Sequence, residues 1–292
     1  MLGTVALVWG ASFMFIKIAD RELAPATLIL GRLGSAAICL AVIAMLRLGT
    51  RRTWDELRGA WRWLVVVALV NVAMPFWLLT WGETRIDSGL ASIIQAAVPI
   101  FVAVIAFGFF RDVRVGGLQL AGIAIGFVGV ALLVGGQPHG KVLAALAVVG
   151  MALCYAVGQL LAARHLQATT PLVVALASTG VAALVALPAG VVQAPHHVPS
   201  GETFAAVLAL GVPGTAFAFL IFYALILRAG AAYAAFVTYL IPPIALAYGA
   251  AFLGERFSAS AFGALALVLA GVALGTGVLH PARFRRGLPS EA

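Results

Sequence analysis

Two related stretches, "SIIQAAVPIF" (Ser92–Phe101) and "AFVTYLIPPI" (Ala235–Ile244), interrupt long apolar runs in this sequence. Each contains a polar side chain four residues before a proline, and the two prolines, Pro99 and Pro242, are 143 positions apart. Proline has no N–H to donate to the carbonyl four residues earlier. Each stretch therefore predicts a bent helix with a polar face at the bend.

The composition is that of a membrane protein. Of the 292 residues, 63% are hydrophobic and 10% are charged, and the mean hydropathy is +1.11. A soluble domain carries about 25% charged residues. The net charge of +8 is distributed over short gaps between apolar segments, which indicates basic loops facing anionic lipid and disfavours a nucleic-acid partner.

The apolar segments have the length of bilayer-crossing helices, which need about 20 mostly apolar residues. Open strands would leave polar backbone unsatisfied in lipid, and the segments lack the alternation of barrel strands. We therefore predict an all-α integral membrane protein. Ten spans are expected, near 2–19, 26–48, 61–81, 88–110, 115–134, 141–161, 171–193, 203–227, 231–253 and 258–279.

The basic residues predict the direction of these spans, because cytoplasmic loops carry an excess of Lys and Arg. We expect a multi-pass protein of a bacterial-type inner (plasma) membrane with both termini in the cytoplasm. Lys17 and Arg32, toward the outer ends of the first two spans, can attract a substrate carboxylate or extend to the headgroups. The cytoplasmic side collects Arg47, Arg51, Arg52, Arg58, Arg62, Arg111, Arg114, Arg164, Arg228, Arg283, Arg285 and Arg286, against Arg21, Arg85, Lys141 and Arg256 on the other side.

The longest cytoplasmic loop, "TRRTWDELRGAWRW" (Thr50–Trp63), also contains a helix signal. Thr53 and Glu56 have the spacing of a capping box, in which the two side chains satisfy backbone N–H groups at a helix start. A short interfacial helix is therefore expected here, with its tryptophans at the headgroups.

The spacing of the two prolines extends to other residues and predicts an inverted repeat. Asp112 and Glu255 each follow their proline by 13 residues. Each half contains five spans, an odd number, so two halves of similar fold must cross the membrane in opposite directions. Such repeats recur in secondary transporters, with the substrate site between the halves near the midplane. We predict two five-helix units, 1–139 and 140–292, the second ending in a short cytoplasmic tail.

Two motifs carry a resemblance to a known family. "WGASFMFIK" (Trp9–Lys17), followed by Pro25 and Arg32, and "YLIPPIALAYGAAFLGERFSASAFGALALVLAGVAL" (Tyr239–Leu274) resemble the EamA-type members of the drug/metabolite transporter superfamily. This resemblance implies a ten-helix inner-membrane transporter whose relatives export amino acids and other metabolites. Asp112 differs from the pattern, which commonly has glutamate there.

Polar and aromatic residues within the spans are the candidates for a substrate cavity. Ser88, Ser92, Gln95 and Pro99 form one helical stripe, which either lines a cavity or supplies hydrogen bonds and a kink to helix packing. For the aromatic candidates the alternatives are core packing and, near the outer end, an interfacial belt. We expect Pro99 and Pro242 to act as hinges. The cavity candidates are Trp9, Ser12, Asn71, Trp77, Ser92, Gln95, Tyr155, Gln159, Tyr223, Thr238 and Tyr239.

Small residues predict close helix packing. Gly122, Gly126 and Gly129 in the fifth span, and Gly271 and Gly275 in the tenth, have the spacing that lets membrane helices approach closely.

The ionisable residues limit the mechanism. All ten acids fall in predicted loops or at span ends, so no buried carboxylate is expected. This favours facilitative export of amino acids and related metabolites, by alternating access, over a proton-coupled drug/metabolite antiporter. Few central cations disfavour phosphorylated substrates. No histidine lies in a predicted span and no metal-ligand pattern is present, which disfavours an intramembrane enzyme. A passive channel is a further alternative. We expect no catalytic residues, metal or cofactor; the expected partners are a small-molecule substrate and the bilayer, and the chain is expected to be a monomer.

Overall fold

The computed structural model describes residues 1–109, 117–135, 139–255 and 257–275. Within these ranges all regular elements are helices, and no strand occurs. Among the described residues, eight helical runs are long and apolar enough to cross a membrane, and the shorter apolar helices Ala121–Leu132 and Ala259–Gly271 accompany them. Large apolar side chains such as Ile38, Leu46 and Leu184 are exposed on the outer helix surfaces. The chain is thus an all-α membrane protein with a lipid-facing exterior.

Six of the described helices are uninterrupted, and their order along the chain agrees with the predicted spans. Two of them begin with proline. The first N–H groups of a helix have no intrahelical acceptor, so proline's lack of an N–H costs no hydrogen bond there. The six helices are α1 (Leu2–Ala19), α2 (Pro25–Arg47), α7 (Gly117–Gly135), α8 (His139–His165), α9 (Pro171–Val192) and α14 (Ala259–Gly275).

The other helical runs are interrupted. α3 (Thr50–Ala68) continues through a π-helical turn, η1 (Leu69–Ala73), into α4 (Met74–Glu83), and α10 (Gly201–Gly211) continues through η2 (Val212–Phe217) into α11 (Ala218–Ala229). The two π-helical turns begin 143 residues apart, the spacing of the two prolines in the sequence repeat. The remaining pairs are α5 (Ser88–Gln95) with α6 (Val98–Phe109), and α12 (Ala231–Ala235) with α13 (Val237–Phe252).

The breaks fall before the predicted hinge prolines. The chain leaves the helix at Ala96 and Ala97, so Pro99 is the second residue of α6, where its missing N–H costs no hydrogen bond. In the second half the break lies at Phe236, six residues before Pro242, and α13 continues through Pro242 and Pro243.

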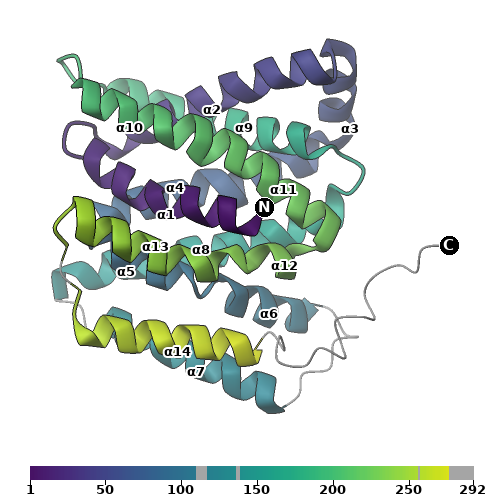
Figure 1. Cartoon of the computed structure of the whole chain (residues 1–292). Coiled ribbons are helices and arrows are strands. Elements are labelled where there is room, and N and C mark those ends of the chain that lie inside the picture. Colours follow the sequence, from purple (N-terminus) through teal and green to yellow (C-terminus); the bar gives the residue numbers. More distant parts are fainter. Residues whose placement is uncertain (110–116, 136–138, 256, 276–292) are drawn as a thin grey trace.

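The helices lie side by side, and α1 begins on the same side of the molecule on which α14 ends (Figure 1). The most extensive packing joins α7 to α14 and α2 to α9. In the centre, α1 packs against α13 and α10, while α8 packs against α4, α5 and α6. Helices from both halves of the chain therefore interleave around one core.

Glycines allow the close approach of α7 and α14. A Cβ atom on Gly271 would lie 2.3 Å from the backbone nitrogen of Gly126 and 2.7 Å from the carbonyl oxygen of Gly122. Backbone atoms cannot move aside as a flexible side chain can. The small-residue packing predicted for these two helices is confirmed at Gly122, Gly126 and Gly271.

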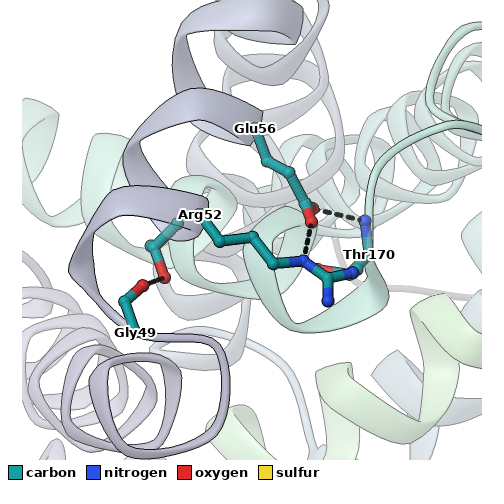
Figure 2. Close-up of polar contacts among 5 residues, drawn as sticks. Gly49, Arg52, Glu56 and Thr170 are labelled. Carbon is teal, nitrogen blue, oxygen red and sulfur yellow. Dashed lines mark hydrogen bonds and ion pairs between the residues drawn. The ribbon is translucent and has the colours of Figure 1, made fainter.

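The start of α3 differs from the capping-box prediction (Figure 2). The helix begins at Thr50 after Gly49, whose φ of +77° favours glycine, and continues into the third span. Thr53 Oγ1 donates to the Gly49 carbonyl over 2.9 Å and so caps no N–H. Glu56 instead accepts from the backbone N–H of Thr170, over 2.8 Å, and from Arg52 Nε, over 3.1 Å. A carboxylate expected to cap its own helix thus attaches α3 to the α8–α9 loop.

Acidic side chains attach loops on the opposite side of the molecule as well. Glu22, between α1 and α2, accepts from the backbone N–H and the hydroxyl of Ser200, over 2.8 and 2.6 Å. Ser200 is the N-cap of α10. Its hydrogen bonds hold the pKa of the Glu22 carboxyl below its usual range. Glu255, after α13, accepts from the backbone N–H and hydroxyl of Ser88 at the start of α5, over 3.2 and 2.7 Å.

Candidate functional site

A narrow cavity lies among the interrupted helices near the centre of the molecule. Its volume is about 30 Å³. Since one water molecule needs roughly 10–15 Å³ of such space, the cavity has room for water but not for a metabolite. The lining side chains come from α1, α2, α4, α5, α8, α11 and α13: Trp9, Ser12, Phe13, Ile16, Arg32, Phe76, Leu79, Gln95, Tyr155, Gln159, Phe219, Phe222 and Thr238.

Arg32 supplies a positive charge to this cavity, although its side chain is only 5% exposed. Its Nε donates to Thr215 Oγ1 over 2.8 Å, and its guanidinium carbon lies 4.3 Å from the centre of the Phe76 ring. Thr215 in turn donates to the Leu210 carbonyl over 2.8 Å, across the π-helical turn η2. A hydrogen bond and a cation–π contact therefore hold the guanidinium in place. The two terminal nitrogens of such a group can bind a carboxylate in the bidentate manner.

Arg32 has no ionic partner among the described residues. The salt bridge within this part of the chain joins Arg52 to Glu56. A buried cation without an anion is costly, and within a membrane such a residue marks a functional site by default. The cavity therefore favours a ligand with a negatively charged group.

Gln159 supplies an unsatisfied acceptor to the same cavity. The side chain is 2% exposed, and its Oε1 has no hydrogen-bond partner among the described residues. Leaving a buried acceptor without a donor costs about 1–3 kcal/mol. Gln95, 6% exposed on α5, and Tyr155, one turn before Gln159 on α8, line the same space. A ligand with an N–H donor would relieve this cost.

Aromatic rings form the apolar wall of the cavity. Trp9 packs edge-on against Phe222 and Phe219, with ring centres 4.8 and 5.8 Å apart, and Phe76 lies 6.0 Å from Phe219. The indole Nε1 of Trp9 donates to the Gly214 carbonyl over 3.1 Å. Because Gly214 belongs to η2, the irregular turn positions both Trp9 and, through Thr215, Arg32. π-helical turns of this kind often occur at functional sites.

A chain of hydrogen bonds outside the cavity lining joins three elements. Asn71 Nδ2 donates to Tyr223 Oη over 3.0 Å, and Tyr223 Oη donates to Ser178 Oγ over 3.0 Å. All three side chains are fully buried. Gly158 on α8 allows Asn71 this position, since a Cβ there would lie 2.4 Å from the Asn71 Cβ. This network joins η1, α11 and α9 and packs against α8.

The residues predicted from sequence divide into four groups. Trp9, Ser12, Gln95, Tyr155, Gln159 and Thr238 lie around the cavity. The hydrogen-bond chain contains Asn71 and Tyr223. Ser92 is buried within α5, donating to the Gly89 carbonyl over 2.6 Å. Trp77 and Tyr239 are partly buried against the core and do not line the cavity.

Several cavity residues were missed by sequence reasoning. Phe13, Phe76, Phe219 and Phe222 stand in apolar runs, where nothing distinguishes a cavity wall from ordinary core. Arg32 carried a usable signal, because a cation in the middle of an apolar segment is rare. The sequence placed it toward the outer end of its span, whereas it lies in the cavity.

The prediction that no acidic side chain is buried was wrong. Glu83, the last residue of α4, is 0% exposed, and neither carboxylate oxygen has a hydrogen-bond partner among the described residues. A helix end is not necessarily a helix surface, because neighbouring helices can cover it. The argument for facilitative transport that rested on the absence of buried acids therefore does not hold.

Helices that are interrupted around a small, partly polar cavity within a membrane protein have the architecture of a small-molecule transporter. Comparisons with known proteins agree. The chain belongs to the EamA-like transporter family, whose model matches residues 1–135 and again residues 142–276.

Named relatives are transporters too. The probable terminal-alkyne amino-acid exporter of Streptantibioticus cattleyicolor is 30% identical, over 92% of this chain and 89% of that protein. The inner membrane transporter YedA of Escherichia coli is 26% identical, over 92% of this chain and 87% of YedA. A transporter of Archaeoglobus fulgidus is 31% identical, and that match spans 46% of each protein, so less than half of its length is covered.

The fold also occurs among solved structures. A crystal structure with 18% sequence identity matches with a TM-score of 0.72, over 96% of this chain and 97% of that one. At this identity the match establishes the fold alone.

Proposed function

We propose that the protein exports amino acids and related small metabolites across a bacterial-type inner membrane by alternating access. The observation that carries this proposal is the pairing, in one cavity, of a guanidinium without an ionic partner and an amide oxygen without a donor. A zwitterion supplies both missing partners. The 30% identical relative that is named a probable amino-acid exporter supports the same class of substrate.

Each part of an amino acid has a matching group in the cavity. The terminal nitrogens of Arg32 bind the carboxylate, and Gln159 Oε1 accepts a hydrogen bond from the ammonium group. The rings of Trp9, Phe219 and Phe222 contact the side chain. A phosphorylated substrate fits less well, because a single arginine neutralises only part of a dianion.

The transport cycle that we propose uses two inverted five-helix units, 1–139 and 140–292. The equal spacing of the two π-helical turns and of the two prolines supports this division, as does the second match of the family model. The packing is reciprocal as well: α1 of the first unit packs against α13 and α10, and α8 of the second against α6 and α4. The excess of arginines in the loops on one side supports cytoplasmic termini.

Alternating access explains the small volume of the cavity. With about 30 Å³ of space, the closed conformation must open before an amino acid can enter. The points at which α3–α4, α5–α6, α10–α11 and α12–α13 are interrupted are where helices can bend. We propose that Pro99 and Pro242 mark the mobile helices on the two sides.

Counterflow into proteoliposomes tests the proposal. Vesicles loaded with an unlabelled amino acid should accumulate the labelled one transiently, which a passive channel cannot do. Amino-acid amides, which lack the carboxylate, and N-acetyl amino acids, which lack the ammonium group, should compete poorly. If both analogues compete as well as the amino acids, or no amino acid produces counterflow, the proposed substrate class is wrong.

A further inference from the structure

Glu83 stands apart from the residues that line the cavity. Its carboxylate is fully buried at the end of α4, and both oxygens lack hydrogen-bond partners among the described residues. Lys17 on α1 donates to the main-chain carbonyl of Glu83 and not to its carboxylate. The substrate site described above makes no use of this group.

An ionised carboxylate cannot remain in such a place without compensation. Burying an unpaired charge is so costly that the group takes up a proton instead. Burial without a hydrogen-bond partner in the described part of the chain therefore favours the protonated, neutral form of the Glu83 carboxyl in this conformation. Lys17 is close enough to act on it electrostatically, and its ammonium group needs to move only from the carbonyl to the carboxylate to stabilise the ionised form.

The other charged groups around Glu83 belong to the substrate cavity, bond to other residues or repel a negative charge. Arg32 acts on it from α2, but its Nε bonds to Thr215 and the side chain lines the substrate cavity. Glu255 acts on it from the loop after α13 but accepts from Ser88. Asp20, which follows α1, adds a further negative charge nearby.

The other segments packed at this end supply no cation that bonds to the Glu83 carboxylate. From α8, Ala144 and Val148 pack against Gly82, beside Glu83, and the charged residue of that end of α8 is Lys141. Before α5, Arg85 and Asp87 are exposed, and Arg85 bonds to the Trp81 carbonyl. Lys17 is thus the cation best placed to exchange with a proton.

The position of Lys17 connects Glu83 to the substrate cavity. Lys17 lies in the last turn of α1, and the same helix contributes Trp9, Ser12 and Ile16 to the cavity wall. A movement of α1 that opens the cavity also moves the Lys17 ammonium group relative to Glu83. Arg32, which lines the cavity, acts on Glu83 electrostatically as well.

We propose that Glu83 is the proton-binding site that couples export to the proton gradient: its carboxyl holds a proton in the closed conformation and exchanges that proton for the Lys17 ammonium group as α1 moves. The proton comes from water on the outer side, forms the carboxyl O–H bond, and returns to water on the inner side as this bond breaks. This inference rests on the proposed transport function and replaces facilitative export by proton antiport.

An infrared measurement tests protonation without any substrate. Wild-type protein in liposomes at neutral pH should show the C=O stretching band of a protonated carboxyl group, which shifts in D₂O. E83Q should lose this band, E83D should retain it at a shifted frequency, and E202Q, which changes an exposed acid at the start of α10, should leave it unchanged. A spectrum in which E83Q and wild type do not differ overturns the protonation of Glu83.

A transport measurement tests coupling. With one proton exchanged per substrate, a gradient of one pH unit can drive up to about tenfold accumulation, because one pH unit is equivalent to a factor of ten in an equilibrium constant. Wild type and E202Q should show this gradient-driven accumulation, and E83Q should lose it. If the amino-acid flux of the wild type does not change with the pH gradient, the proposed proton coupling is wrong.

The infrared and transport measurements test separate claims. If no amino acid is carried, the proposed substrate class is wrong, while the infrared band still decides whether Glu83 is protonated. Thermal unfolding in detergent separates misfolding from loss of coupling: glutamine has the shape of a protonated glutamate, so E83Q should unfold at the wild-type temperature. A lower unfolding temperature for E83Q would instead indicate an ion pair with Lys17 and overturn the proposal.

Discussion

Replacing Arg32 is the most direct perturbation of the substrate cavity. Its guanidinium is held by a 2.8 Å hydrogen bond from Nε to Thr215 and lies 4.3 Å from the Phe76 ring centre. Arg32→Gln removes the charge, and Arg32→Lys keeps it but replaces the planar fork by a single ammonium group. That group cannot bind a carboxylate in the bidentate manner while also bonding to Thr215.

The expected magnitudes follow from the burial of this residue. Truncating one partner of a buried, hydrogen-bonded charge pair costs about 2–5 kcal/mol. Because 1.4 kcal/mol corresponds to a factor of ten, Arg32→Gln should weaken amino-acid binding about 30-fold to several thousandfold. Arg32→Lys should lose about one charged hydrogen bond, about 1.5–3 kcal/mol, and so about 10- to 150-fold in affinity.

Counterflow in proteoliposomes, measured over a range of substrate concentrations, gives the affinity of each variant. Arg85→Gln is a matched control, because Arg85 makes a similar cation–π contact, 4.1 Å from the Trp81 ring centre, but is exposed outside the cavity. Thermal unfolding in detergent shows whether each variant is folded.

A substrate analogue makes the test specific to the carboxylate. The amide of the same amino acid lacks the charged group, so its weak binding should be almost unaffected by Arg32→Gln. This forms a thermodynamic cycle in which the protein change and the ligand change are coupled. If Arg32→Gln retains wild-type affinity, or weakens the amino acid and its amide equally, Arg32 does not bind the carboxylate.

Three further substitutions test the packing and the loop contacts. Gly158→Ala places a Cβ 2.4 Å from the Asn71 Cβ, and such overpacking costs about 1–3 kcal/mol, so the variant should unfold at a lower temperature in detergent; an unchanged unfolding temperature would show that Asn71 can move aside. Gly271→Ala should lower the unfolding temperature, whereas Gly263→Ala on the same helix, with no atom within 4 Å of its Cβ, should not; equal effects would contradict the close approach of α7 and α14. Because hydrogen bonds at the α10 N-cap lower the pKa of Glu22, the stability from these bonds is present above the ordinary glutamate pKa and is lost as the pH falls through the lower, folded value. The unfolding temperature of wild type should therefore fall in acid more steeply than that of Glu22→Gln, and parallel curves would contradict this.

Local properties of the sequence were enough to predict an all-α membrane protein and the approximate positions of its apolar helices. A segment such as Pro171–Val192 is apolar throughout and begins with proline, so its state in a bilayer depends on little beyond its own residues. The recurrence of a proline motif after 143 residues likewise predicted irregular helices at related positions in both halves. The small-residue spacing of α7 and α14 predicted their close contact, because only backbone approach makes glycine useful there.

Only the tertiary structure decided which polar groups are buried and what they meet. Glu83 and Glu56 both occur near helix ends in the sequence. The Glu83 carboxylate is buried without a hydrogen-bond partner among the described residues, whereas Glu56 bonds to a residue 114 positions away. Arg32 enters the cavity because Thr215, from the other half of the chain, receives its Nε. Burial and hydrogen bonding between distant residues depend on how helices pack, and the hydrophobic pattern of a single helix contains no information about its neighbours. For this protein the sequence by itself indicated the membrane helices, and packing between helices that are far apart in the sequence determined the cavity and the charges within it.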